Sequence, residues 1–322
     1  MKHKRWHKVV YLAIAFIAFY YVVKKLLAFD QWDYISGRFI NEFWFLLVIF
    51  QVVLWVLNIG MESLRWRYLL NTFTKVSFSN SVKMVLMGFT TGSISPMKIG
   101  EPGGKILGLK KDERPTGILA SVYGSYINST VLFLIALFIF PVALSSGLLS
   151  IPVSFQLSLF SSVILGICIL LGSYVIVYFF FRQIKKHVRN SKWALKPEFF
   201  NSFRLNKFPI LFLYTLIRVI VYNVQLYIWF RFFNITDLGL DFFLLSPLYF
   251  AAITLIPAIF LFDLGIRGSV GVYIFSSLSN NLGAVLSALF FLWFLNVALP
   301  VLWGSLLLIR SKSHKKQANT VQ

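Results

Sequence analysis

The chain has 322 residues, of which 58% are hydrophobic and 13% are charged, and its mean hydropathy is +0.77. Soluble globular domains carry about 25% charged residues, so this composition excludes an ordinary soluble fold and indicates a surface that faces lipid. The formal net charge of +20 does not indicate nucleic-acid binding, because Lys and Arg gather in short loops and tails between nearly uncharged apolar runs. Such loops are typical of the cytoplasmic face of membrane proteins and also attract anionic lipid headgroups.

Six apolar runs are long enough to cross a bilayer, which takes about 20 residues. In chain order they occupy roughly residues 9–28, 43–61, 116–140, 156–181, 208–233 and 284–309. Two further apolar stretches, 79–108 and 243–282, are interrupted by Gly, Pro and charged residues. We therefore predict an all-α polytopic membrane protein with six full spans and two broken or re-entrant segments. No long polar linker divides the chain, so residues 1–322 are predicted to form one membrane domain, which ends in a basic cytoplasmic tail at 311–322.

The positions of Lys and Arg predict the orientation, because these residues are enriched in cytoplasmic loops. Both terminal tails and the long loop at 182–207 are basic, whereas the loop at 29–42 is acidic. We therefore predict a protein of the plasma or inner membrane with both termini in the cytoplasm.

Charge also predicts that the two interrupted stretches turn back. Basic residues flank 79–108 on both sides, so this glycine-rich stretch is expected to enter and leave from the cytoplasm as a re-entrant hairpin. The stretch 243–282 is expected to begin and end outside, either as a second hairpin or as two short helices. Paired interrupted segments are a sequence pointer to the binding site of an inverted-repeat carrier, and we interpret the two halves as such a repeat.

Three sequence motifs accompany the broken segments. The second apolar run ends in NIGMESLRWR (58–67), the first broken segment contains SPMKIGEPGGK (95–105), and the second contains PAIFLFDLGIRG (257–268). Together they resemble the transmembrane region of lysylphosphatidylglycerol synthetase/flippase proteins, a family of flippase-like membrane domains. Their order and spacing match that family across nearly the whole chain.

The family pattern consists of an Arg-Trp pair, a Pro-x-x-x-Gly-Glu turn and a late Pro followed by Gly-x-Gly-x-Arg-Glu. The residues assigned to motif and structure are Glu62, Arg65, Trp66, Pro96, Gly100, Gly103, Gly104, Pro257 and Gly265. This chain departs at two positions, because Asp263 stands at the usual first Gly and Gly268 at the usual Glu. A role of that Glu therefore cannot be transferred to this chain.

The resemblance implies that the domain moves a lipid or lipid-linked headgroup between leaflets. In the aminoacyl-lipid proteins a soluble aminoacyltransferase domain follows this region, whereas a short basic tail follows it here. We therefore expect no aminoacyl-tRNA chemistry in this sequence.

Five charged residues are the candidates for contact with a lipid headgroup: Glu101, Lys105, Arg218, Asp263 and Arg267. Charged side chains are costly inside a membrane unless they are paired, and they mark functional sites there. A structural role competes with substrate contact in each case. Glu101 has a capping role or an ion pair with Lys98 as its alternative. Asp263 and Arg267, four residues apart, can neutralise each other.

Arg218 lies deep in its span, where the alternative to lining a polar cavity is snorkelling to the cytoplasmic headgroups. Glu62 and Arg65, three residues apart, are interpreted as an interfacial ion pair. The polar residue Asn128 either lines a path along its span or bonds to a neighbouring helix.

The sequence leaves three function classes open. The first is a translocator of a phospholipid or lipid-linked substrate with an anionic headgroup. The second is a membrane-embedded accessory of lipid or glycan synthesis, which binds a polyprenyl phosphate or a partner synthase or glycosyltransferase. The third is an intramembrane enzyme that uses Glu101 as acid or base, and it is disfavoured because we find no catalytic motif. The single Cys168 and four loop histidines predict no metal site, and no cofactor is expected.

Overall fold

The computed structural model describes residues 44–95, 98–149, 207–235, 238–256 and 260–318, with isolated positions before residue 44 and between 161 and 183. The regular elements in these residues are all helical. They are α3 (Trp44–Leu70), α4 (Phe78–Ser93), α5 (Glu101–Lys105), η2 (Ile106–Gly108), α6 (Arg114–Ser145), α8 (Phe208–Phe232), α9 (Leu240–Leu255), α10 (Phe260–Phe275), α11 (Leu282–Trp293), the π-helical turn η5 (Phe294–Ala298) and α12 (Leu299–Ala318). Pro96, Pro257 and most of the predicted spans 9–28 and 156–181 lie outside the described residues.

Four described helical stretches are long and apolar enough to cross a membrane: Trp44–Leu70, Arg114–Ser145, Phe208–Phe232 and Leu282–Arg310. They coincide with four of the six predicted spans and confirm an all-α polytopic membrane protein. Helix α3 continues nine residues beyond the predicted end of its apolar run, and α12 remains helical to Ala318, within the segment predicted as a tail. Lys, Gln and Ala are good helix formers, which accounts for that extension.

Local sequence signals explain where several helices begin. The Ser77 side chain caps α4 by accepting a hydrogen bond from the N–H of Asn80, and Asn281 caps α11 by accepting from Ala284. Pro stands in the first turn of α6 and of α8. A backbone N–H at this position would have no acceptor within the helix, so proline costs no helical hydrogen bond there.

The two interrupted stretches are broken into short helices. Helices α4, α9 and α10 each have 16 residues, which corresponds to about 24 Å, less than the hydrocarbon thickness of about 30 Å. Helix α4 packs against α5, and α9 packs against α10. We call the segment from α4 to η2 the first hairpin and the segment from α9 to α10 the second hairpin.

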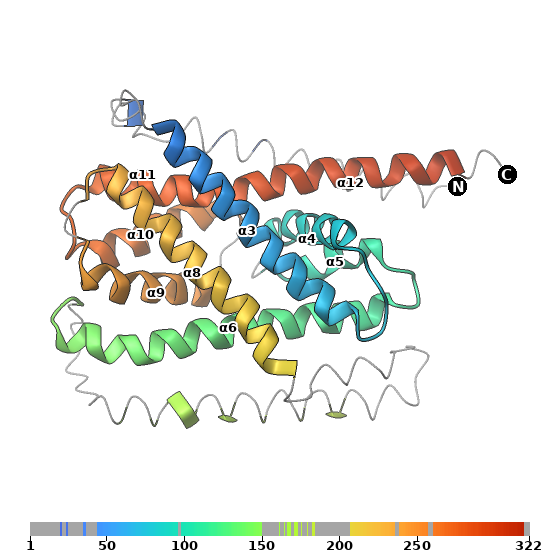
Figure 1. The fold of residues 1–322 in the computed structure, drawn as a ribbon, viewed down its shortest axis with the longest axis horizontal. Helices are drawn as coiled ribbons and strands as arrows, with labels where there is room; N and C mark the ends of the chain where they lie inside the picture. The colour runs from blue at the N-terminus through green and yellow to red at the C-terminus, as the bar shows by residue number, and fades with distance from the viewer. Residues whose placement is uncertain are drawn as a thin grey trace.

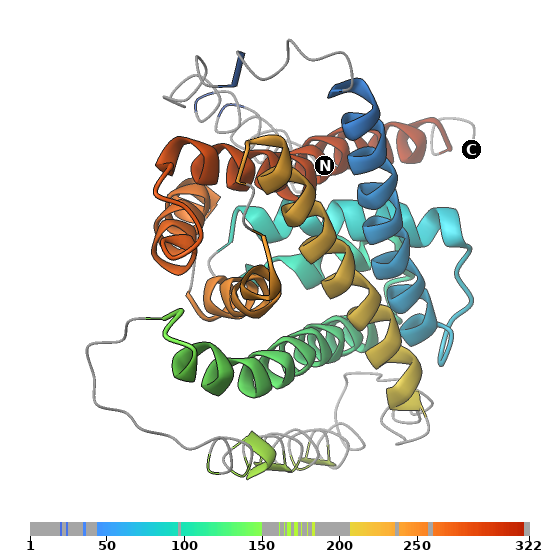
Figure 2. The same ribbon diagram turned by 60° about the vertical axis from the view of Figure 1, so that its left-hand side comes forward.

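The long helices frame these hairpins. Helices α3 and α8 pack against each other and cross the other helices obliquely (Figure 1). The two hairpins lie side by side behind this crossing pair (Figure 2), with α12 on the first hairpin, α11 on the second, and α6 packed against both. The order of long helix, broken pair and long helix occurs twice in the described chain, which fits a repeat; the predicted inverted repeat itself stays a prediction.

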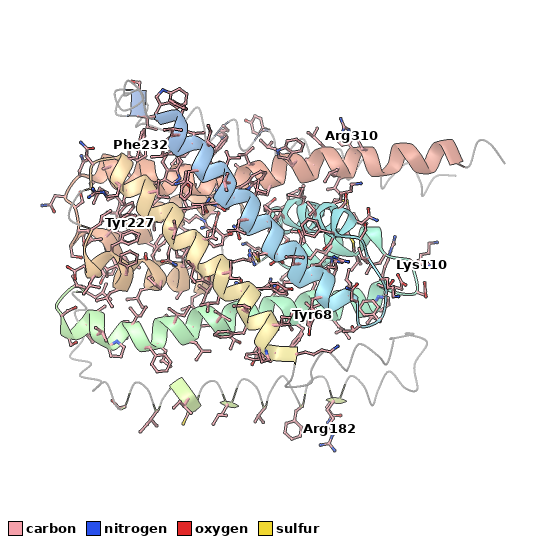
Figure 3. All side chains as sticks on the ribbon, viewed as in Figure 1. Tyr68, Lys110, Arg182, Tyr227, Phe232 and Arg310 are labelled. Atoms are coloured by element: carbon pink, nitrogen blue, oxygen red, sulfur yellow. The ribbon has the colours of Figure 1, made fainter. Side chains whose placement is uncertain are left out.

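Aromatic side chains pack the second hairpin against α8 and α11. The rings of Trp229 and Phe291 stack with their centroids 4.7 Å apart, and Phe230 meets Phe275 edge-on at 4.9 Å. Figure 3 shows Tyr227 and Phe232 at this end of α8, far from Lys110 on the opposite side of the molecule. Such ring pairs bury large areas in preferred geometries, so they stabilise the packing of the second hairpin on α8 and α11.

Candidate functional site

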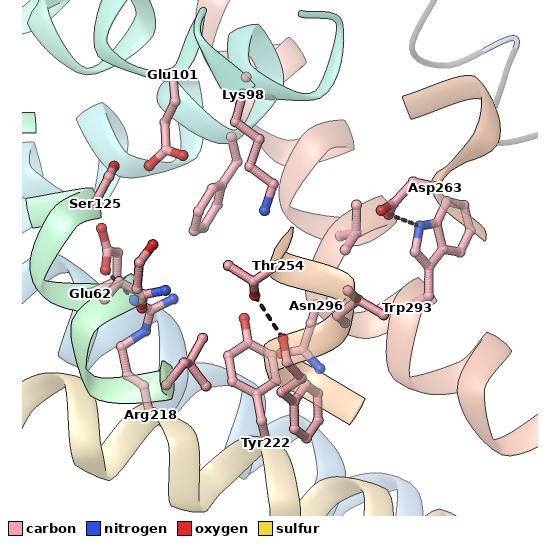
Figure 4. Close-up of a pocket in the computed structure, with 18 of the residues that line it drawn as sticks. Glu62, Lys98, Glu101, Ser125, Arg218, Tyr222, Thr254, Asp263, Trp293 and Asn296 are labelled. Carbon is pink, nitrogen blue, oxygen red and sulfur yellow. Dashed lines mark hydrogen bonds and ion pairs between the residues drawn. The ribbon is translucent and has the colours of Figure 1, made fainter. Parts of the chain in front are cut away.

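A cavity of about 440 Å³ lies where the two hairpins meet α3, α6, α8, α11 and η5. Figure 4 shows charged and polar side chains reaching into it from several elements. The charged and polar residues that line it are Glu62, Arg65, Ser93, Lys98, Glu101, Ser125, Asn128, Ser129, Arg218, Tyr222, Thr254, Asp263, Arg267, Trp293 and Asn296. A polar cavity among apolar helices is the kind of place where ionisable residues inside a membrane protein are expected.

Glu62 on α3 is the centre of a buried ion-pair network. One of its oxygens lies 2.6 Å from Arg65 and 2.5 Å from Arg218, and the other lies 2.8 Å from Lys105. Its side chain is only 2% exposed. The predicted pairing of Glu62 with Arg65 is confirmed, but both residues are buried in the protein. Three cations around one carboxylate join α3, α8 and the first hairpin.

Lys105 joins this network to the turn of the first hairpin. Its ammonium lies 2.7 Å from Glu101 as well as 2.8 Å from Glu62, and it sits 5.5 Å from the centre of the Trp66 ring. Lys105 is 3% exposed and is not among the lining residues, so the structure places it behind the cavity wall. Glu101 lines the cavity and pairs with Lys105, the residue four positions later, whereas the sequence had suggested Lys98.

Arg218 is held inside the protein by two partners on α3. Its Nη1 donates to Glu62 and its Nε donates to the side-chain oxygen of Asn58, at 2.9 Å. Arg218 is buried and lines the cavity. Of the two alternatives drawn from the sequence, the structure therefore shows the polar cavity.

The second hairpin contributes Asp263 and Arg267 from α10. The Nε of Arg267 donates to Asp263 at 2.8 Å, and the indole N–H of Trp293 donates to the same oxygen at 3.0 Å. Both charged residues line the cavity. Asp263, which replaces the usual Gly of the motif, thus neutralises Arg267 and ties α10 to α11.

Lys98 also lines the cavity, although it was not among the predicted headgroup contacts. It lies in the turn of the first hairpin with φ at +58°, in the left-handed region that non-glycine residues seldom adopt. Its side chain extends into the cavity between Glu101 and Asp263 in the view of Figure 4. Within the described part of the chain no ion pair reaches it. Its place in a Pro/Gly turn was the available sequence signal.

A chain of buried amides continues from Arg218 away from the charges. Asn58 accepts from Arg218 and donates to Asn296 at 2.9 Å; Asn296 donates to Gln225 at 2.9 Å, and Gln225 exchanges bonds with Gln51. Asn296 belongs to η5, and π-helical turns are frequent at functional sites. A single Asn in a long apolar run had given no signal for this role.

Replacing Asn296 with Leu is expected to lower the free energy of unfolding by about 1–3 kcal/mol, because the buried side chains of Asn58 and Gln225 lose a partner. Thermal unfolding of the detergent-solubilised protein measures the loss. The exposed Asn280→Leu variant is the control and should unfold like the parent protein. An unchanged unfolding temperature for Asn296→Leu would show that the amide chain contributes nothing.

The structure brings most of the predicted site residues together. Glu101, Arg218, Asp263 and Arg267 line one cavity, and Glu62 and Arg65 line it too. The motif residues Gly103 and Gly104 belong to α5, which positions Glu101. Headgroup contact by any of these residues stays a prediction.

The family model described as the lysylphosphatidylglycerol synthase TM region matches residues 9–304. The chain belongs to this family. No curated protein and no solved structure matched it. In this chain the motif residues Gly100-Glu101 and Arg267 belong to different hairpins, and Glu101 and Arg267 border the same cavity. The chain is therefore a membrane-embedded domain of this family, and charged residues from all three motifs line one internal cavity.

Proposed function

We propose that this protein moves an anionic lipid headgroup between the leaflets of the cell membrane, and that the headgroup passes through the cavity between the two hairpins. The observation that carries the proposal is the cavity itself, which is lined by motif residues from both hairpins. The family relationship supports a flippase-like membrane domain in general terms. The acyl chains would remain in the bilayer while the headgroup occupies the cavity.

Electrostatics support this use of the cavity. Ionisable side chains inside a membrane protein are costly, and they are tolerated where they pair with one another or serve a transported ligand. Most of the cations here are already paired with Glu62, Glu101 or Asp263. Arginine can hold two phosphate oxygens at once, so Arg218 and Arg267 suit a phosphate that approaches from the cavity.

In this proposal the protein resides in the plasma or inner membrane with cytoplasmic termini, and it acts as a carrier without catalysing a reaction of its own. The accessory function remains the alternative, because a site that binds a lipid phosphate also suits a protein that presents the lipid to a synthase or glycosyltransferase. The two differ in whether the purified chain alone moves lipid.

Reconstituted protein should accelerate transbilayer movement of acyl-chain-labelled phosphatidylglycerol. An impermeant quencher outside the vesicle quenches the label that reaches the outer leaflet. The resulting loss of fluorescence over time measures the movement. Protein-free vesicles are the baseline. The absence of acceleration for every anionic headgroup tested would contradict the proposal, and co-purification with a glycosyltransferase would then favour the accessory function.

The double variant Asp263→Asn/Arg267→Gln is expected to slow this movement about ten- to a hundredfold, since a charge-assisted bond to phosphate contributes about 1.5–3 kcal/mol. Removing both partners leaves no unpaired charge, so folding should survive and is checked by size-exclusion chromatography. Arg310→Ala, which removes an exposed arginine within α12, is the matched control. Equal rates in both variants would exclude Arg267 from the path.

A further inference from the structure

The cavity and its immediate ion pairs carry more cations than carboxylates. Among the residues that the structure describes, five cationic side chains stand against three anionic ones, an excess of two positive charges. The cations are Arg65, Lys98, Lys105, Arg218 and Arg267, and the carboxylates are Glu62, Glu101 and Asp263. Uncompensated charge in a low-dielectric interior is costly, so the occupied cavity is most stable when its ligand supplies two negative charges.

Part of the excess is located at Lys98, and the hairpin turn holds this residue in place. The N–H of Lys98 donates to the carbonyl of Ser95 at 3.2 Å, and the hydroxyl of Ser95 accepts from the N–H of Gly100 at 2.7 Å. A left-handed non-glycine residue costs about 1–3 kcal/mol and persists where its surroundings enforce it, often at ligand sites. This turn directs the ammonium of Lys98 into the cavity.

The rest of the excess lies in the network around Glu62. Arg65, Arg218 and Lys105 share Glu62 and Glu101, which leaves one positive charge, whereas Asp263 and Arg267 balance each other. Two cations of this network, Arg65 on α3 and Arg218 on α8, line the cavity. Lys98 on the first hairpin, which no ion pair among the described residues reaches, and the partly compensated pair Arg65 and Arg218 thus face the same cavity.

On the basis of the proposed function, we propose that the transported headgroup is a phosphate monoester, a lipid whose phosphate is terminal, and that Lys98 selects it. A phosphate monoester carries a charge of about −1.5 to −2 at pH 7, whereas a phosphodiester carries one negative charge. The dianion matches the excess of two in the cavity. Lys98, as a compact ammonium with three donors, binds the terminal phosphate as a point charge, and Arg218 meets it from the opposite wall.

Binding to the full-length protein in detergent tests this inference. Isothermal titration calorimetry compares dihexanoyl phosphatidic acid, a monoester, with dihexanoyl phosphatidylglycerol, a diester of equal chain length. We expect the monoester to bind at least tenfold more tightly at pH 7.5. Inorganic phosphate is the third probe and should bind more weakly than the lipid. Phosphate binding that equals the lipid's would show a site for the free ion and overturn the lipid assignment.

The variant Lys98→Asn isolates the charge of Lys98. Asn tolerates the left-handed conformation, so the turn is kept while the charge is lost. Monoester affinity should fall about tenfold and diester affinity less, which reduces the preference, whereas Lys98→Arg should keep it. An unchanged preference in Lys98→Asn would overturn the assignment of Lys98.

The ligand's own titration gives a second readout. A phosphate monoester takes up its second proton near pH 6, so its affinity should fall between pH 7.5 and pH 5.5 more than that of the diester. The charged groups that face the ligand are Lys98 and Glu101 on the first hairpin, Asp263 and Arg267 on α10, Arg218 on α8, and Glu62 and Arg65 on α3. Both lipids meet the same protein groups. The difference between their pH profiles therefore reports the protonation of the ligand's own phosphate.

These outcomes separate the inference from the proposed function. Movement of labelled phosphatidylglycerol without any preference for the monoester would overturn the headgroup assignment and leave the translocator standing. Preferential binding of the monoester without movement of any lipid would uphold the headgroup assignment and contradict translocation.

Discussion

Replacing Glu62 with Gln is expected to abolish most of the folded protein. The change leaves Arg65, Lys105 and Arg218 buried around a neutral side chain. Breaking one buried ion pair by removing a partner costs about 3–5 kcal/mol. That is a large part of the total stability of about 5–15 kcal/mol that is typical of a folded protein. The fraction that elutes as a single species after solubilisation, together with its unfolding temperature, measures the effect.

Glu113→Gln is the control for this experiment. Glu113 is also mostly buried, but the contact described for its carboxylate is the N–H of Lys110 at 3.2 Å, in the loop before α6. This variant should fold nearly as well as the parent protein. Normal yield and stability of Glu62→Gln would show that the three cations do not depend on Glu62.

A second change should partly rescue Glu62→Gln. Arg218→Met removes one of the stranded cations while keeping an apolar stem in the same space. The double variant is expected to be more stable than the sum of the two single effects predicts, with a coupling of about 0.5–3 kcal/mol, because the two side chains are in direct contact. Strict additivity would contradict the network.

Gly104→Ala is the second change for which we expect a large effect, because α5 lies directly against α4. A Cβ on Gly104 would overlap the carbonyl oxygen of Met87 and the hydroxyl of Thr91. Since both atoms belong to or lie close to the backbone of α4, the two helices must move apart, at a cost of about 1–3 kcal/mol. This movement shifts Glu101 and Lys105, which are the first and last residues of α5. Unfolding temperature and lipid movement should therefore both fall.

The neighbouring residue provides a matched control for this prediction. A Cβ on Gly103 meets nothing within 4 Å, so Gly103→Ala makes the same chemical change on the open side of the same short helix. It should leave stability and lipid movement close to those of the parent. Equal behaviour of the two variants would contradict the close packing of α4 on α5.

Part of the site was predictable because its signals are local. The pair Glu62–Arg65 lies three residues apart, and Asp263–Arg267 lies four apart, so one helical turn brings each pair together. The Pro- and Gly-rich turn that carries Glu101 is equally local. Interrupting Gly, Pro and charged residues predicted which stretches break, and the structure shows short helices in both.

Other contacts were out of reach for a physical reason. Glu62 meets Lys105 and Arg218 only because the first hairpin and α8 pack on α3, at sequence separations of 43 and 156 residues. Lys105 was predicted to contact the headgroup, yet packing turns it toward two carboxylates. Asn296 lies in the π-helical turn η5 and faces Asn58. The periodicity of a uniformly apolar run does not reveal where such a turn changes the direction in which side chains point.

The sequence by itself determined that this is a polytopic helical membrane domain, which stretches of it are broken, and which motifs it shares with its family. These properties follow from hydropathy, from charge along the chain and from local glycine and proline patterns. Only the tertiary structure decided which cations are neutralised and which face the cavity, because ion pairing depends on side chains that meet across helices. The excess of positive charge at Lys98 and in the network around Glu62 is therefore a property of the packed helices.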